Sequence, residues 1–234
     1  MDFRLYALCF ATFVLVATSF AYGWKFLRKR NYLLGVEWLV ITFSASNFLL
    51  YMLSGSPAAY GISYFCDAFS RGFGIPVIAI AGLMVVTHRY RPSIFADVWF
   101  FVVGIAAGAV LVATDSALKP YFYVVMWAMF SVYLGYFAWR LMSVGEKRRA
   151  MGVILALLSS LAIACIYDFY KIPGEDTNIL INFYVLAALT WSYVLFELYY
   201  AYCALERADE DATPLKTSRS ASRHARSPEP ARGA

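Results

Sequence analysis

The chain has 234 residues, of which 62% are hydrophobic and only 15% are charged. A soluble domain carries about a quarter charged residues, so this composition excludes an ordinary soluble globular protein. The formal net charge of +5 does not indicate nucleic-acid binding, because the basic residues lie between apolar blocks and in the tail, as in membrane proteins.

Seven long apolar blocks alternate with short charged or turn-rich joints. About 20 apolar residues cross a hydrocarbon core about 30 Å thick, and backbone polar groups in lipid must pair within the segment. We therefore predict an all-α integral membrane protein with a single bundle of seven transmembrane helices in one domain, residues 1–203. The predicted spans are 3–24, 32–53, 60–87, 96–114, 120–142, 150–169 and 178–202.

The joints also predict the orientation. Ten Lys and Arg residues follow spans one, three and five, whereas three lie at the opposite ends. The positive-inside rule then puts the N-terminus outside and the C-terminus in the cytoplasm, as expected for a bacterial-type inner membrane. The first span is read as a retained helix rather than a signal peptide, because its positive cluster follows the apolar run.

Span three carries an acid and a base one helical turn apart. Asp67 and Arg71 lie on one helix face, which Tyr64 continues. Ionisable groups within a membrane helix cost roughly 2.5–3.5 kcal/mol each on insertion scales, so each needs a partner or a purpose. The pair is therefore either a neutral staple that lets the helix insert or a binding site for a polar solute.

Two groups of small residues follow the pair. Gly72, Gly74 and Pro76 come directly after it and loosen the helix, which predicts a bend that permits gating. Such interruptions are tolerated where they line a cavity or are packed by protein, and they point to transporter binding sites. In span four, Gly104 and Gly108 form a GxxxG motif, which is read as a close-packing face rather than a dimer signal.

Spans two and seven carry further polar residues. Asn47 lies within about a quarter-turn of the face that carries Glu37, and Asn182 and Glu197 share one stripe of span seven. By depth, Asn47 and Asn182 share the outer half with Asp67, whereas Glu37 and Glu197 share a level about 7–8 Å from the cytoplasmic end. These two layers predict a solute site in the outer half of the membrane and a second polar cluster near its cytoplasmic end.

Arg140 in span five approaches the lower layer. A cluster of Glu37, Glu197 and Arg140 would place two acids beside one base and disfavour the second anion, which predicts proton coupling by the two glutamates. The alternative is that Arg140 snorkels to the interface. Asp168, at the end of span six, is read as a wet interfacial residue.

The tail from residue 204 to 234 has almost no large apolar residue and is predicted to be disordered. Its first half is acidic and its second half basic. It is therefore either a solvated tail without a role or a contact for anionic lipid or a cytoplasmic partner.

Several chemistries find no supporting residues in the sequence. No lysine lies in the last span, which excludes the Schiff base of a retinal pigment, and His88 and His224 cannot provide bis-histidine haem ligation. The four cysteines have no CxxC spacing, so neither a disulfide framework nor a metal site is supported. No hydrolase or nucleotide-binding motif occurs; a carboxylate-only enzyme stays open, and no cofactor is expected.

The leading hypothesis is a small-molecule transporter or carrier for a polar or zwitterionic solute. Its partners would be the lipid bilayer and the solute, with no nucleic acid, and its oligomeric state is left open. The alternative is a non-transporting sensor or accessory subunit whose buried charges are structural. The predicted site residues are Asp67, Arg71, Asn47, Asn182 and Tyr64 for substrate binding, Glu37 and Glu197 for proton coupling, and Gly72, Gly74 and Pro76 for gating.

Overall fold

The computed structural model describes residues 3–90, 92–114, 116–169 and 179–224; within these, the side chains of residues 4, 179–182 and 212–224 are not described. All regular structure in these ranges is helical, and seven helical segments are long and apolar enough to cross a membrane. The prediction of an all-α protein with seven spans is confirmed, whereas the orientation of the termini stays a prediction. The elements are α1 (Phe3–Arg28), α2 (Tyr32–Ser54), α3 (Pro57–Phe69), η1 (Ser70–Ala79), α4 (Ile80–Thr87), α5 (Ile94–Ala113), α6 (Lys119–Ser143), α7 (Lys147–Ile166) and α8 (Ile179–His224).

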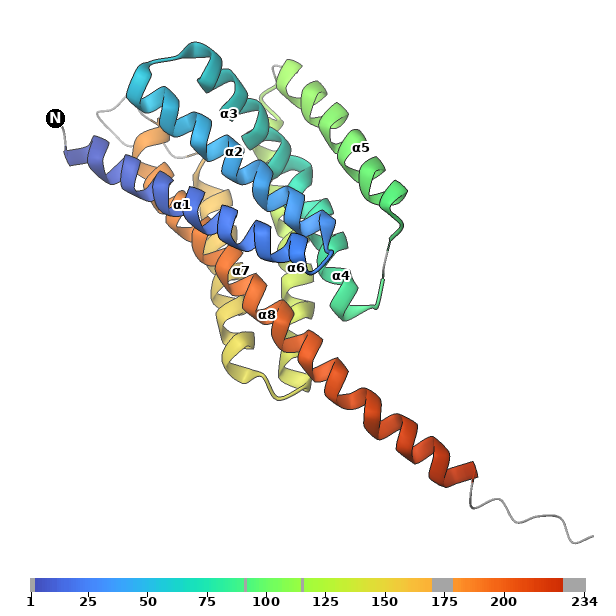
Figure 1. Ribbon diagram of the computed structural model, residues 1–234. Helices are drawn as coiled ribbons and strands as arrows, with labels where there is room; N and C mark the ends of the chain where they lie inside the picture. The colour runs from blue at the N-terminus through green and yellow to red at the C-terminus, as the bar shows by residue number, and fades with distance from the viewer. Residues whose placement is uncertain (1–2, 91, 115, 170–178, 225–234) are drawn as a thin grey trace, which may run out of the picture.

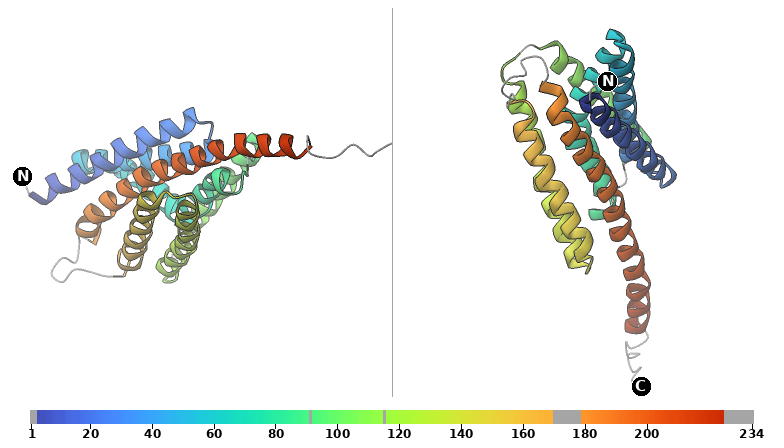
Figure 2. Two further views of the ribbon diagram at one scale, coloured as in Figure 1. Left: turned by 90° about the horizontal axis from the view of Figure 1, so that it is seen from below. Right: turned by 90° about the vertical axis from the view of Figure 1, so that its left-hand side faces the viewer.

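The helices surround a buried third span. Helix α1 lies against α2 and α8, while α6 and α7 form an antiparallel hairpin that packs beside α8 (Figures 1 and 2). The third span, Pro57–Thr87, is the most buried of the seven spans, with 72% of its apolar window inside the protein. The charged pair predicted from the sequence therefore sits on the span that faces protein most completely.

The third span is continuous but changes its winding. Ser56 caps its start, accepting a hydrogen bond from the amide of Ala59 at 3.4 Å. The α-helix α3 then passes into the π-helix η1 and returns to α-helix at α4, with Pro76 inside η1. Proline has no N–H and clashes with the carbonyl four residues back, so the chain widens its turns there. The irregularity expected at Gly72, Gly74 and Pro76 is present as a π-helical segment, whereas a bend there and its role in gating stay predictions.

Helix α5 flanks the bundle and packs mainly on α3 and η1 (Figure 1). Its two GxxxG glycines face Phe69: an added Cβ would lie 3.0 Å from the Phe69 ring at Gly104 and 3.3 Å from the Phe69 Cβ at Gly108. The motif thus brings two helices of the same chain together, which confirms the prediction of a close-packing face.

Helix α8 continues without a break to His224, where the sequence predicts disorder from residue 204. The difference has a physical reason. Leu205 is buried, and the ion pairs Lys29–Glu206 and Arg89–Asp209 tie the next two turns to the bundle. Alanine, glutamate and arginine are also good helix formers, so the segment extends the last span (Figure 1). Residues 225–234 lie outside the described residues.

Candidate functional site

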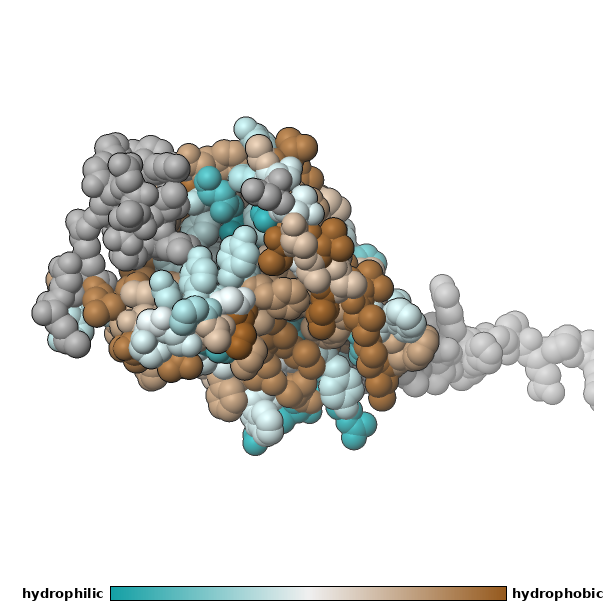
Figure 3. Space-filling model, turned by 90° about the horizontal axis from the view of Figure 1, so that it is seen from above, coloured by the Kyte–Doolittle hydropathy of each residue, from teal (hydrophilic) through white to brown (hydrophobic). Residues whose placement is uncertain are grey.

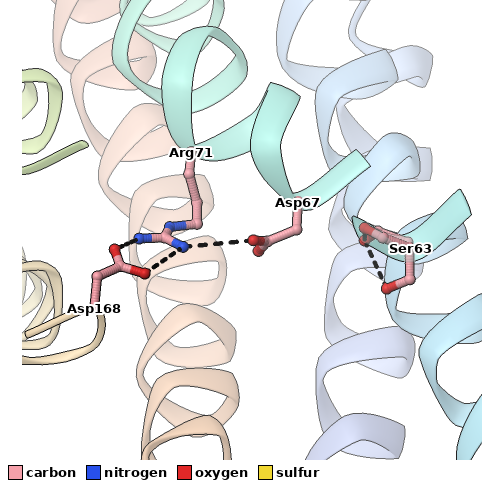
Figure 4. Close-up of polar contacts among 5 residues, drawn as sticks. Ser63, Asp67, Arg71 and Asp168 are labelled. Carbon is pink, nitrogen blue, oxygen red and sulfur yellow. Dashed lines mark hydrogen bonds and ion pairs between the residues drawn. The ribbon is translucent and has the colours of Figure 1, made fainter. Parts of the chain in front are cut away.

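Arg71 is held between two carboxylates that come from different parts of the chain (Figure 4). Its NH1 lies 3.5 Å from Asp67 Oδ2, which confirms the pair predicted from the spacing of four residues. The same NH1 donates to Asp168 Oδ1 at 3.4 Å, and NH2 donates to Asp168 Oδ2. Asp168 therefore binds the guanidinium through two hydrogen bonds, in the bidentate geometry that is common for arginine–carboxylate pairs. The interfacial role expected for Asp168 is replaced by a role in this cluster.

Two tyrosine rings cover the guanidinium. Its carbon lies 4.1 Å from the ring centroid of Tyr123 and 4.9 Å from that of Tyr167. Cation–π contacts of this kind strengthen when the cation is removed from water. The Arg71 side chain is only 7% exposed, so carboxylates and rings together replace its hydration.

A cavity of about 80 Å³ lies beside the ion pair. Its lining comes from α1, α2, α3, η1, Tyr167 and α8, and therefore from helices that are far apart in the sequence. From above, hydrophilic residues gather in a recess at this end of the molecule, whereas its flanks are largely hydrophobic (Figure 3). The polar and aromatic residues of the lining are Ser44, Phe48, Tyr60, Ser63, Tyr64, Asp67, Ser70, Arg71, Tyr167, Tyr184 and Trp191.

A row of tyrosines leads to Asp67 along the α2–α3 hairpin. The rings of Tyr51 and Tyr60 are 4.9 Å apart between centroids, and those of Tyr60 and Tyr64 stack at 6.2 Å. Tyr60, Tyr64 and Asp67 lie on successive turns of α3, and all three border the cavity. Tyrosine rings therefore line the side of the cavity that leads to the Asp67 carboxylate.

Two polar atoms of the lining have no protein partner. Among the described residues, the hydroxyl of Ser70 and the indole nitrogen of Trp191 are buried and make no hydrogen bond. By contrast, the Ser44 hydroxyl donates to the carbonyl of Ser63 at 3.1 Å. Buried polar groups are nearly always paired, so the Trp191 nitrogen is a position for water or a bound molecule, whereas the Ser70 hydroxyl lies toward the carboxyl group of Glu37.

The predicted solute residues divide into three groups. Asp67, Arg71 and Tyr64 come together at the cavity. Asn47 does not: its side-chain amide donates to the carbonyl of Phe43, one turn earlier in α2, at 2.8 Å. Asparagine can satisfy itself on its own helix in this way, which helical spacing alone does not reveal. The side chain of Asn182 lies outside the described residues.

Glu37 is fully buried, and neither of its carboxyl oxygens has a hydrogen-bond partner in the described part of the chain. It packs on η1, where a Cβ on Gly74 would overlap its carboxyl group. Ser70 interacts with the same carboxyl group and also borders the cavity. Gly74 thus leaves room for the Glu37 carboxyl group. Ser70, which borders the cavity, lies between this carboxyl group and the cavity.

The predicted lower cluster of Glu37, Glu197 and Arg140 is not formed. Glu197 pairs instead with Arg149 of α7, at 3.2 Å, and its carboxyl group lies against Gly152. The Nε of Arg140 is buried without a partner among the described residues. Depth along a helix does not determine which neighbouring helix an acid faces: α8 packs between α1 and α7, and Glu197 faces α7.

These features define a polytopic membrane protein in which a buried arginine between two partly exposed acids lies beside a cavity. Comparisons of the chain with protein-family models, with curated proteins and with solved structures find no match. Within the described ranges, no three His, Cys, Asp or Glu side chains are grouped so that they could hold a metal ion.

Proposed function

We propose that the protein is a small-molecule transporter or carrier whose solute binds in the cavity beside Asp67 and Arg71. The observation that carries the proposal is this cavity, which brings together a charged pair, an aromatic lining and, in Trp191, an indole nitrogen without a hydrogen-bond partner among the described residues. Ionisable groups are costly within membrane helices and mark solute pathways there. The solute is proposed to be polar or zwitterionic, since the wall carries ionised side chains and hydroxyl groups.

In this proposal the third span changes shape during transport. The π-helical segment η1 carries Arg71 and Ser70 of the cavity wall together with Gly72, Gly74 and Pro76. π-Helical turns are frequent at functional sites, and this one would rewind as the solute enters or leaves. Glu37, against Gly74 and Ser70, is the residue that would carry a coupled proton. Glu197 is less suited, because Arg149 already neutralises it.

A ligand-induced thermal-shift screen tests the proposal. Purified protein in detergent is screened against polar and zwitterionic metabolites, because a ligand that binds only the folded state raises the unfolding temperature. We expect at least one compound class to stabilise the protein and to lose its effect in Asp67→Asn. Stabilisation of the variant to the same extent would place the ligand elsewhere, and the absence of any stabilising compound would contradict the proposal.

A second function is favoured by one observation. Arg71 pairs with Asp67 and Asp168 and lies against two tyrosine rings, which also suits a structural staple in a sensor or accessory subunit. Under that function the tail would dock a cytoplasmic partner or anionic lipid. Deletion from residue 212 spares the described contacts of α8 with the bundle. It should therefore leave uptake into reconstituted vesicles intact for a carrier and abolish complex formation for a docking subunit.

A further inference from the structure

We propose that the cavity takes a small monovalent organic cation, with Asp67 as its counter-ion. This inference rests on the proposed solute-binding function and narrows it to one charge class. It is argued from the charge balance of the cluster, from the groups that cover Arg71, and from the aromatic and hydrogen-bonding character of the wall.

The cluster has one base and two acids, so its formal charge is −1 when all three groups are ionised. Asp168 bonds both terminal nitrogens of Arg71, whereas Asp67 meets a single nitrogen at 3.5 Å. The closer, bidentate partner neutralises the guanidinium. The surplus negative charge therefore resides on Asp67, which lines the cavity, while Asp168 does not.

Within the described part of the chain, no positive group other than Arg71 lines the cavity. Asp67 and Arg71 are the only charged residues among those that line the cavity. The guanidinium nitrogens face the two carboxylates, and the rings of Tyr123 and Tyr167 cover the guanidinium plane. A carboxylate or phosphate in the cavity would therefore lie beside the Asp67 carboxylate without a cation to pair with, and like charges at short distance repel. The same repulsion applies to the negative end of a zwitterion.

The rest of the wall suits an ammonium group with a short polar arm. Phe48 and Tyr184 face each other with ring centroids 4.4 Å apart, and Tyr60 and Tyr64 flank Asp67. Aromatic faces attract cations, including quaternary ammonium groups. Trp191 lines the cavity, and its indole N–H has no hydrogen-bond partner among the described residues; a hydroxyl oxygen of a ligand would supply an acceptor.

The cavity volume limits the size of the ligand. About 80 Å³ corresponds to roughly five to eight water positions at about 10–15 Å³ each. A molecule with a similar number of non-hydrogen atoms fits, whereas a large drug-like amine does not. A hydroxyl-bearing quaternary ammonium ion meets the requirements of charge, aromatic contact, acceptor and size together.

Three compounds of nearly the same shape test the charge class on the full-length purified protein. Choline is the cation, 3,3-dimethylbutan-1-ol replaces its nitrogen by carbon and is neutral, and glycine betaine is zwitterionic. Calorimetric titration should show choline binding at least tenfold more tightly than either analogue. If the neutral or the zwitterionic compound binds as well as choline, the cation inference is overturned while the solute site stands. If none of the three compounds binds, the cation inference is overturned. The proposed solute-binding function is tested separately by the thermal-shift screen of polar and zwitterionic metabolites.

Two variants with the same change in charge locate the site. Asp67→Asn should weaken choline binding at least tenfold, whereas Asp97→Asn should leave it within twofold, because Asp97 does not line this cavity. Asp67→Asn is expected to fold, since Asp168 still holds Arg71, and its unfolding temperature without ligand checks this. Choline binding within twofold of the unaltered protein in Asp67→Asn would overturn the inference.

A third variant tests the polar arm. Trp191→Phe removes the indole N–H and keeps an aromatic ring. It should weaken choline binding more than tetramethylammonium binding, because tetramethylammonium has no hydroxyl group. If the variant weakens the binding of both ions equally, Trp191 does not recognise the hydroxyl group of the ligand. The inference is then overturned for the hydroxyl group and holds only for the ammonium group.

Discussion

Arg71 is the residue whose environment decides the chemistry of the cavity. It is almost fully buried, so its charge depends on protein groups rather than on water. The two acids that hold it are not equivalent: Asp168 bonds both nitrogens, and Asp67 lies at the limit of an ion pair.

The first prediction ranks the two acids by stability. Asp168→Asn removes a bidentate, charge-assisted contact and should lower the free energy of unfolding by roughly 1.5–3 kcal/mol. Asp67→Asn removes a longer, partly exposed contact and should cost about 0–1 kcal/mol. Thermal unfolding followed by intrinsic tryptophan fluorescence measures both. Equal losses would show that Arg71 depends on the two acids alike.

The second prediction concerns the contact between Glu37 and Gly74. Gly74→Ala places a methyl group where the Glu37 carboxyl lies, and it should cost roughly 1–3 kcal/mol through overpacking. Adding Glu37→Ala to Gly74→Ala should restore part of this loss. Gly61→Ala is the matched control, because a Cβ there meets nothing within 4 Å. An equal effect of alanine at both glycines would contradict the contact.

At the scale of elements, the winding of the third span is the unusual feature. The segment η1 has π-helical bonding over ten residues, and it lies between two α-helices in the most buried span. π-Helical turns are rare and mostly occur as single-turn bulges within α-helices, so we expect ten residues of this winding to be less stable than the α-helical turns on either side. The wide turns place Ser70 and Arg71 at the cavity and Gly74 against Glu37.

The third prediction follows from this winding. Backbone amides of η1 should exchange with deuterium several-fold faster than those of α3 and α4, although all three are buried. Hydrogen exchange with mass spectrometry in lipid nanodiscs measures this. Pro76→Ala restores an N–H and should slow exchange in η1 alone. Equal protection along Pro57–Thr87 would mean that the π-helical turns are as stable as their neighbours.

The fourth prediction concerns the extension of α8. Deletion from residue 204 removes buried Leu205 and the ion pairs of Glu206 and Asp209. The leucine contributes about 1.5–3 kcal/mol and each surface ion pair about 0–1 kcal/mol. This deletion should therefore lower the unfolding temperature, whereas deletion from residue 212 should not. Identical unfolding temperatures would show that the extension contributes nothing to the fold.

For the whole molecule, the orientation in the membrane can be tested directly. The excess of ten Lys and Arg over three predicts that the α2–α3 joint faces the outside and the α6–α7 joint the cytoplasm. In a background without the four native cysteines, Ser56→Cys should react with a membrane-impermeant maleimide in intact cells, and Ser143→Cys should react only after lysis. The reverse pattern would invert the topology.

How much could be predicted from the sequence differs between the fold and the site. The helices, the seven spans, the Asp67–Arg71 pair and the irregular turn at Pro76 follow from hydropathy, from a spacing of four residues and from the missing proline N–H. Each of these depends on neighbours within one helix. The signal for Asp168 was an acid at the end of an apolar span beside tyrosines, which also describes an ordinary interfacial residue.

The sequence by itself therefore determined what each segment is: a helix long enough to span a membrane, and a third span with a charged pair and a weak turn. Only the tertiary structure decided that Asp168 completes the cluster around Arg71, that Glu197 pairs with Arg149, that Glu37 rests on Gly74, and that α8 runs past residue 204. The reason is physical. Local energies set winding and hydrophobicity, whereas the partner of a buried charge depends on which helices pack side by side, and periodicity within one helix carries no information about that.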